Sequence, residues 1–327
     1  MKYRILAVMI SVSICLGLTA CGGGEEPEET TSTEKAVSVS NNDLDNESIV
    51  ISVGKTTVKY NEYQTYFYFM RNPYEGVLGD EIWSYSKADS EGKTLGQEAV
   101  EAVLRLIIQV KVICKEAAIQ KVSLGTDEKE QASHNAKEVY DSLDDRVKEE
   151  NGIDLGVLTR IFEENKLAQK MYNIEIGKVS ADLTAEQVKA ARVQLIYLKA
   201  DDANRAEVRK KAEQIRKSLS GTGNSFYTVA KSNTEAAEIE VLVGGSDTRT
   251  NLAKTVVGMK AGTVSDVIDE KDGVYIVYCV EADSKGLENQ YRNQVILEKQ
   301  TQAFQQAYST WADQFEVKVS KALLVGK

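Results

Sequence analysis

The feature that most constrains this fold is a long amphipathic helix near the end of the chain. Its apolar and small polar residues recur at steps of three and four, which places them on one helical face: Tyr291, Gln294, Leu297, Thr301, Phe304, Tyr308, Trp311 and Phe315. The small α/β unit expected before this helix offers no partner for such a wide face. We therefore expect the helix to pack back onto the N-terminal helices, with Trp311 and Phe315 as core contacts, so that the α/β unit is an insert in a helical body.

The N-terminal part of the body, residues 48–185, has the pattern of a short strand pair followed by helices. The strands are Ile49–Val53 and Thr57–Val58, with a turn at Gly54-Lys55, and Asn61 is expected to cap the next helix. Later helices are predicted by apolar periodicity from Val100 to Ala117, by a charged stretch from Asp127 to about Glu150, and by a face from Leu158 to Tyr172 capped by Asp154. Residues 285–327 supply a C-terminal helix and strand that complete this domain.

Aromatic residues are concentrated in the helix that follows the first strand pair: Tyr63, Tyr66, Phe67, Tyr68 and Phe69. Large aromatic side chains are more often buried than exposed, so we interpret them as core and packing residues. A binding patch for an unfolded partner is the alternative.

The insert, residues 190–282, has the order βααβαβ. Strands are predicted at Val193–Leu198, Ile239–Val243 and Val274–Val280, which are rich in β-branched residues. Between the first two strands, helices are predicted from Val208 to Leu219 and from Phe226 to Lys231. The whole chain is therefore expected to be α+β.

The N-terminus has the pattern of an export signal that ends at a cysteine. Lys2 and Arg4 precede the apolar run Ile5–Leu18, which is shorter than the roughly 20 residues of a membrane-spanning helix. Leu18-Thr19-Ala20-Cys21 resembles the lipobox of bacterial lipoproteins, in which the cysteine is acylated and the signal is removed. We expect residues 1–20 to be the signal and Cys21 to carry the lipid; an ordinary signal with a chance cysteine is the alternative.

Residues 21–47 are expected to form a disordered acidic tether. From Gly22 to Glu47 the chain holds eight acidic residues and one basic residue and has little apolar surface to bury. The whole chain carries −10, the signal contributes +2 and the tether −7, which leaves −5 for the part from Ser48. This balance, without a basic patch, argues against a nucleic-acid partner.

Cysteine and histidine usage argues against a metal site or a cofactor. Cys114 and Cys279 both lie in apolar runs, which favours buried free thiols over a disulfide. His134 is the only histidine and lies in a charged stretch, where a solvated helix position is expected. With one histidine and no Cys-x-x-Cys spacing, a zinc site is not predicted.

Three stretches carry motifs in a fixed order. The first runs from Val50 to Tyr66 and the second from Leu104 through Glu128. The third, Ala191 to Glu281, contains Phe226-Tyr227-Thr228-Val229-Ala230-Lys231, Gly244-Gly245, Met259-Lys260-Ala261-Gly262-Thr263-Val264-Ser265 and Gly273-Val274-Tyr275-Ile276-Val277. Together they resemble the parvulin-type foldases of the PrsA and SurA group. The resemblance implies a chaperone-like helical body around a parvulin-like domain at 190–282.

The resemblance also implies a groove that holds proline, with an apolar pocket and a polar set that includes two histidines. Here Leu195 and Tyr275 stand at the two histidine positions, and Thr248 and Leu252 stand at the pocket methionine and phenylalanine positions. The loop after Gly245 is also shortened. The expected degenerate groove is lined by Leu195, Tyr197, Thr248, Leu252, Met259 and Tyr275, and no catalytic residue is assigned.

A parvulin accelerates rotation about an X-Pro bond, whose barrier is about 18–20 kcal/mol, by binding the twisted amide better than the planar one. Because both histidines are replaced and the loop is short, we expect little or no isomerase activity. The sequence thus predicts a lipid-anchored foldase or holdase on the extracytoplasmic face of a bacterial membrane, with unfolded exported proteins as partners. The alternatives are an active prolyl isomerase and a non-catalytic scaffold of a cell-envelope complex.

Overall fold

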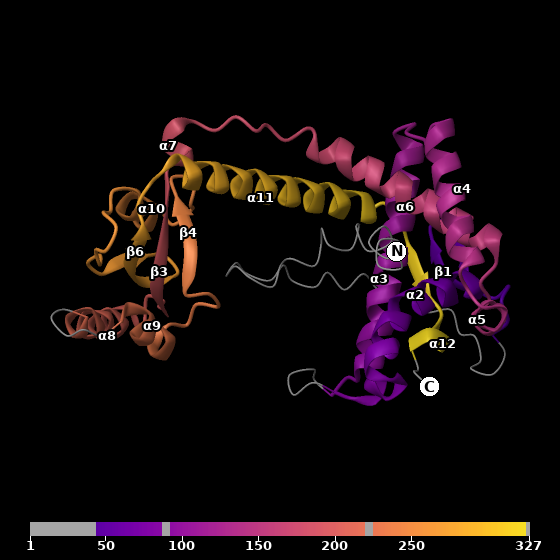
Figure 1. Cartoon of the computed structure of the whole chain (residues 1–327), viewed down its shortest axis with the longest axis horizontal. Helices are drawn as coiled ribbons and strands as arrows, with labels where there is room; N and C mark the ends of the chain where they lie inside the picture. Colours follow the sequence, from indigo (N-terminus) through magenta and orange to yellow (C-terminus); the bar gives the residue numbers. More distant parts are fainter. Residues whose placement is uncertain (1–43, 87–91, 220–224, 325–327) are drawn as a thin grey trace. The chain divides into compact units, whose positions relative to one another are not determined.

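The computed structural model describes residues 44–86, 92–219 and 225–324. The predicted signal 1–20, the lipidation site Cys21 and nearly all of the tether 21–47 therefore lie outside the described residues. The described chain divides into two compact units (Figure 1): Val179–Gln300 forms one, and the residues up to Lys178 together with those from Thr301 form the other. We call the second of these the body and Val179–Gln300 the insert unit.

The body is built from helices around a small sheet. Its elements are β1 (Ile49–Val53), β2 (Thr56–Lys59), α2 (Tyr60–Leu78), the 3₁₀-helix η1 (Asp80–Ser84), α3 (Leu95–Ile119), α4 (Thr126–Asp141), α5 (Asp145–Glu150), α6 (Leu155–Ile176), the end of α11 (Lys285–Ala312), β7 (Val317–Val319) and α12 (Lys321–Leu324). The predicted cap of α6 is confirmed, because the Asp154 carboxylate accepts a hydrogen bond from the Val157 amide at 2.9 Å.

The sheet of the body joins the two ends of the described chain. Its strand order is β2-β1-β7, and both pairs are antiparallel. Gly54 makes the tight turn between β1 and β2 with a positive φ of 56°, which suits glycine. Ile51 of β1 pairs with Val319 of β7. The C-terminal segment is thus part of the body, as the insert topology requires.

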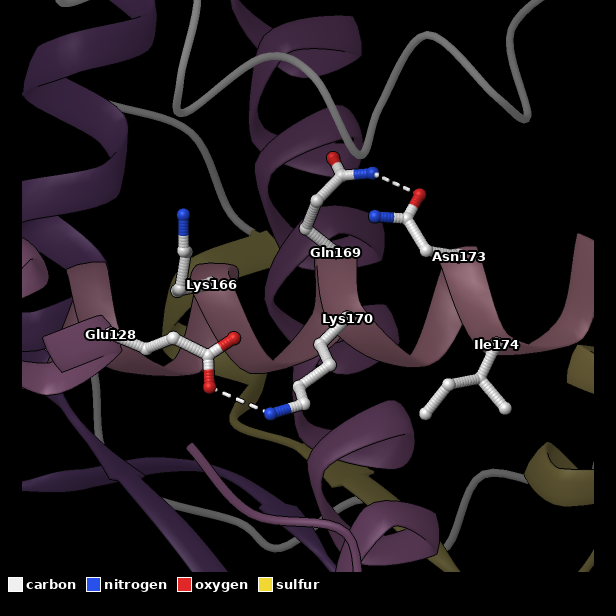
Figure 2. A pocket seen from close by; sticks show the side chains of 6 residues that line it. All are labelled: Glu128, Lys166, Gln169, Lys170, Asn173 and Ile174. Carbon is white, nitrogen blue, oxygen red and sulfur yellow. Dashed lines mark hydrogen bonds and ion pairs between the residues drawn. The ribbon is translucent and has the colours of Figure 1, made fainter. Parts of the chain in front are cut away.

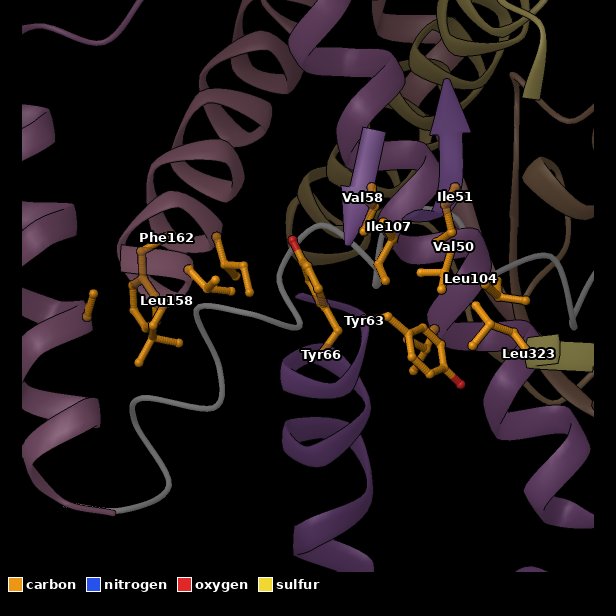
Figure 3. Close-up of a cluster of buried hydrophobic side chains, with 14 of the residues drawn as sticks. Val50, Ile51, Val58, Tyr63, Tyr66, Leu104, Ile107, Leu158, Phe162 and Leu323 are labelled. Atoms are coloured by element: carbon orange, nitrogen blue, oxygen red, sulfur yellow. The ribbon is translucent and has the colours of Figure 1, made fainter. Parts of the chain in front are cut away.

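The core of the body has two parts. The first contains Val50, Ile51 and Val58 of the sheet with Tyr63 and Tyr66 of α2 (Figure 3). The second brings α3, α6 and the end of α11 together: Val112, Ile113, Ala168, Met171, Phe304 and Trp311 are all buried there. The prediction that the last helix packs on the N-terminal helices is therefore confirmed.

Two details of the body differ from the sequence prediction. Asn61 is not a helix cap, because α2 begins at Tyr60 and the buried Asn61 lies inside its first turn. The charged stretch from Asp127 to Glu150 is not one helix but two, because the chain turns at Ser142 between α4 and α5. The Ser142 hydroxyl donates to the Val139 carbonyl oxygen at 2.7 Å, which satisfies one of the carbonyls at the end of α4.

The insert unit is a four-stranded antiparallel sheet with helices on both faces. Its elements are α7 (Ala185–Val188), β3 (Ala190–Lys199), α8 (Arg205–Ser218), α9 (Phe226–Asn233), β4 (Glu240–Gly244), α10 (Thr250–Val257), β5 (Ile268–Glu270), β6 (Gly273–Glu281) and the start of α11. The strand order is β4-β3-β6-β5. The sequence prediction missed β5, because this strand is only three residues long.

Successive residues of the central strands face opposite sides of the sheet. Ile196 and Ile276 pack under α8 and α9, whereas Leu195 and Val277 pack under α10. This alternation explains why both central strands are almost entirely buried.

The long helix α11 serves both units. Leu287, Tyr291 and Val295 are buried, and Tyr291 and Val295 pack with Ala190 in the insert unit, whereas Phe304 and Trp311 belong to the body core. The sequence had assigned all of 285–327 to the body. The structure places the boundary after Gln300, because the apolar face of the helix finds partners in each unit along its length.

Candidate functional site

The expected groove residues lie mostly together, on the face of the insert sheet that α10 covers. Leu195 and Tyr275 are 3% and 2% exposed, and Leu252 is fully buried. Tyr197 and Met259 are half-buried and pack against the same cluster. The sixth residue, Thr248, is exposed in the loop before α10.

Strand register and a helix cap position these side chains. Tyr197 pairs with Tyr275 across β3 and β6, so both side chains point to one face. The Glu270 carboxylate accepts hydrogen bonds from the amides of Asn251 and Leu252 at 2.6 and 2.8 Å. This contact satisfies free amides at the start of α10 and holds Leu252 over the sheet.

Tyr197 and Tyr275 form a stacked pair within the expected groove. Their ring centroids are 4.9 Å apart with an interplanar angle of 30°. The Tyr275 hydroxyl donates to the Asp272 carboxylate at 2.6 Å, and the Tyr197 hydroxyl donates to the Asp272 backbone carbonyl at 2.9 Å. Burial is the main cause that raises the pKa of both phenols, so both are neutral at physiological pH.

An arginine that the sequence analysis did not single out completes the site. Arg249 lies with its guanidinium carbon 5.4 Å from the centroid of the Tyr275 ring. Asp247 accepts from Arg249 Nε at 2.9 Å and from Nη2 at 2.6 Å, a bidentate pair. Burial opposes the charge on Arg249, but the Asp247 partner outweighs it and raises the arginine pKa. The spacing Asp247-x-Arg249 in the shortened loop was the only signal in the sequence.

Polar side chains lie beside the apolar face of this cluster. Leu195 and Tyr275 are buried against their neighbours, Arg249 is paired with Asp247, and the Asp272 carboxylate accepts from the Tyr275 hydroxyl. Tyr197 and Met259 are half-buried at the edge of this cluster, whereas Leu195, Leu252 and Tyr275 are buried within it. The geometry therefore supports packing and local rigidity more than the binding of a proline ring.

Neither thiol offers an alternative nucleophile. Cys114 and Cys279 are both free. Burial raises the pKa of Cys114 to about 12 and that of Cys279 above its ordinary value, so both remain protonated thiols near neutral pH. Within the described ranges, no group of three or more metal-ligating side chains comes together.

The body has a shallow depression of about 310 Å³ at the start of α4 and along α6 (Figure 2). It is lined by Glu128, Lys166, Gln169, Lys170, Asn173 and Ile174. Lys170 donates to the Glu128 carboxylate at 2.6 Å. Glu128 also accepts from the Gly125 amide, which caps the start of α4, so the Lys170 contact joins this cap to α6. We assign no binding role to this polar surface.

Comparison with known proteins supports the assignment of the insert unit. Residues 194–281 match the family model of the rotamase PPIC-type PPIase domain. This match confirms the resemblance to a parvulin domain that the sequence motifs carried. No curated protein matches the chain.

Several solved structures are similar to the chain at low identity. The peptidyl-prolyl isomerase PrsA from Bacillus anthracis is 17% identical, covers 64% of this chain and 96% of its own, and has a TM-score of 0.40. The foldase PrsA from Streptococcus pneumoniae is 20% identical, covers 84% and 97%, and has a TM-score of 0.27. One of two SurA-like chaperones of Campylobacter jejuni is 10% identical, covers 83% and 98%, and has a TM-score of 0.31. The assignment rests on the family model.

No helix in the described parts of the chain is long and apolar enough to span a bilayer.

Proposed function

We propose that this chain, whose residues 194–281 belong to the PPIC-type parvulin family, is a lipid-anchored foldase or holdase. It would assist the folding of exported proteins. The body and the insert unit would bind unfolded chains, and the parvulin-like domain would have weak or no isomerase activity. One observation carries the second part: at the two histidine positions, Leu195 and Tyr275 are buried, and Tyr275 is stacked on Tyr197.

The physical reason is that isomerisation requires a site that binds the twisted amide more tightly than the planar one. Such a site needs an accessible pocket for the proline ring and polar groups directed at the amide. In the insert unit, Leu252 is fully buried and the Tyr275 hydroxyl is directed at Asp272. We therefore propose that the groove, lined by Leu195, Tyr197, Thr248, Leu252, Met259 and Tyr275, would bind the twisted amide and the proline ring weakly.

Two assays on the full chain test this proposal. At a catalytic dose, we expect no acceleration of a refolding reaction that is limited by one X-Pro bond. At a stoichiometric dose, we expect the chain to suppress the aggregation of a reduced, unfolded model protein. A clear acceleration would instead favour an active prolyl isomerase, the alternative supported by the family match. If the folded protein neither accelerates refolding nor suppresses aggregation, the result would point to a scaffold and contradict the proposal.

The lipid anchor is tested separately by cell fractionation. Cys21→Ala should release the protein from the membrane fraction, because the thiol that would carry the acyl chains is absent. Cys15→Ala, a substitution within the predicted signal, is the matched control and should leave the protein membrane-bound. Retention of the Cys21→Ala protein in membranes would contradict the anchor at this position.

A further inference from the structure

The apolar stripe of helix α2 continues past the point where the body covers it. Tyr63 is buried and stacks on the half-buried Phe67, with ring centroids 5.7 Å apart. Two and three turns further along the same face, Tyr74, Val77 and Leu78 are 54%, 82% and 58% exposed. Their spacing of three and four residues places them together on one side of the helix. A helix face with this pattern normally has a partner.

The 3₁₀-helix η1 extends this exposed surface with two more aromatic residues. The Trp83 ring packs edge-on against Tyr74, with centroids 6.0 Å apart. The Trp83 indole N–H donates to the Glu75 carboxylate at 2.8 Å, which fixes the ring. Tyr85, two residues further on, is 62% exposed. We call the surface formed by Tyr74, Val77, Leu78, Trp83 and Tyr85 the α2 tip.

The charges around the α2 tip define what it can bind. Glu75 is paired with Arg71 at 3.0 Å, which neutralises both. Asp80 and Glu81 are exposed and form no ion pair with another described residue. The tip is thus an apolar and aromatic surface with an excess of negative charge at its edge, and it complements a partner that combines apolar and basic side chains.

We propose that the α2 tip is a binding site for extended polypeptide segments in which apolar residues lie beside lysine or arginine. The inference rests on the proposed function, because such segments are exposed in unfolded chains. Tyrosine and tryptophan supply large contact areas with few rotatable bonds. The acidic edge disfavours two other occupants: an anionic bilayer, which attracts basic surfaces, and a second copy of this acidic chain.

The test uses the full chain and two fluorescent peptides of equal length. One contains leucine, phenylalanine, serine and lysine; in the other, glutamate replaces every lysine. The lysine peptide should bind by fluorescence anisotropy and should shift the Trp83 emission to the blue, whereas the glutamate peptide should bind at least about tenfold more weakly. Trp311 is buried, so Trp83→Phe should abolish the shift.

Substitutions then locate the site. Val77→Ser with Leu78→Ser should weaken binding of the lysine peptide at least about tenfold, because two exposed apolar contacts are lost. Ile119→Ser is the matched control, since Ile119 is 57% exposed at the end of α3 and outside the tip. Asp80→Lys with Glu81→Lys should reverse the preference between the two peptides. All three side chains of the body that are replaced by serine are exposed, so the variants should keep the wild-type circular dichroism.

Four results would overturn the inference. These are unchanged binding by the Val77→Ser, Leu78→Ser variant, equal binding of both peptides, tip-dependent sedimentation with phosphatidylglycerol vesicles, and tip-dependent self-association. The aggregation assay with the wild-type chain distinguishes a failure of this inference from a failure of the proposed function. If the wild-type chain suppresses aggregation but the peptide does not bind the tip, only the α2 tip is excluded as the site. If the wild-type chain does not suppress aggregation, the holdase function itself fails.

Discussion

At the scale of single residues, a leucine and a phenol, Leu195 and Tyr275, stand where the sequence motifs predict the two histidine positions of the parvulin family. An imidazole titrates near neutral pH, whereas Tyr275 is held protonated by burial and donates to Asp272. The site therefore has no group that changes charge between pH 5 and 8 at this position. What Tyr275 contributes instead is stability, and that contribution depends on pH only in the alkaline range.

We predict that Tyr275→Phe lowers the stability of the insert unit by about 1 kcal/mol at neutral pH, because one hydrogen bond is lost. The unfolded phenol ionises near 10.0, whereas burial raises the folded pKa above that value. Stability from the protonated phenol is therefore complete below pH 10 and falls by about 1.4 kcal/mol per pH unit until the folded pKa is reached. The difference between variant and wild type should shrink, and then reverse, as the pH rises above 10.

Urea unfolding followed at several pH values measures this effect. Tyr227→Phe is the matched control, since Tyr227 is 48% exposed in the same unit and the substitution should leave the profile as in wild type. A Tyr275→Phe curve that runs parallel to the wild-type curve at every pH would show that the Tyr275 phenol is not linked to folding.

The sequence could predict which strand residues face the same side of the sheet, but not their loop contacts. The assignment of Leu195 and Tyr275 to the histidine positions stays a prediction, which rests on strand motifs whose register is fixed within a two-residue alternation. Arg249 and Asp247 were missed, since a bidentate pair formed inside an irregular loop has no periodicity. Thr248, placed in the groove from the family pattern, is exposed and stays a prediction. A loop position is harder to assign from sequence than a strand position, because loop length changes the direction of each side chain.

At the scale of elements, a glycine pair allows close packing at the end of β4. A Cβ on Gly245 would lie 2.1 Å from the Glu186 carbonyl oxygen, and a Cβ on Gly244 would lie 2.5 Å from the Lys189 carbonyl oxygen. These neighbours are backbone atoms of the segment that leads into β3, so they cannot move aside without disturbing the sheet. The space available, rather than a special backbone angle, requires glycine here.

Accordingly, Gly245→Ala should destabilise the insert unit by about 1–3 kcal/mol or more, the usual range for overpacking. Gly258→Ala is the control, because the nearest atom to its Cβ would be 3.8 Å away at the end of α10. Thermal unfolding monitored by circular dichroism compares the two variants with the wild type. Equal melting temperatures for both would show that the segment before β3 adjusts without cost.

Element boundaries were predictable where a capping residue or a regular stripe marked them. Thr184 and Gln187, three residues apart, form a reciprocal cap at the start of α7. The division of the charged stretch into α4 and α5 was not visible, because polar helices carry little periodic signal and Ser142 is not a strong helix breaker. The start of α2 was misplaced by a local preference, since the Asn61 amide donates to Asp154 instead of capping the helix.

At the scale of the whole molecule, the two units have separate cores. The buried clusters around Ile107 and Phe304 contain only residues of the body, and those around Val277, Ile276 and Tyr291 contain only residues of the insert unit. The wide face of the last helix predicted this topology from sequence. The point of division within α11 required the structure, since the predicted stripe includes Leu297, which is 52% exposed between the buried Val295 and Phe304.

We predict that the body folds without residues 179–300 when Lys178 and Thr301 are joined by a flexible Gly/Ser linker. The variant should be helical and should unfold cooperatively, because its core and its β1–β7 strand pair remain complete. A shorter deletion of residues 190–282 should also be helical but should bind more of a hydrophobic dye. It retains Leu287, Tyr291 and Val295 of α11 but removes Ala190 and Leu242, against which this part of the helix packs. Circular dichroism and dye fluorescence compare the two deletions directly.

Non-cooperative unfolding of the longer deletion would show that the body depends on the insert unit. Equal dye binding would place the end of the insert unit at residue 282 instead of residue 300.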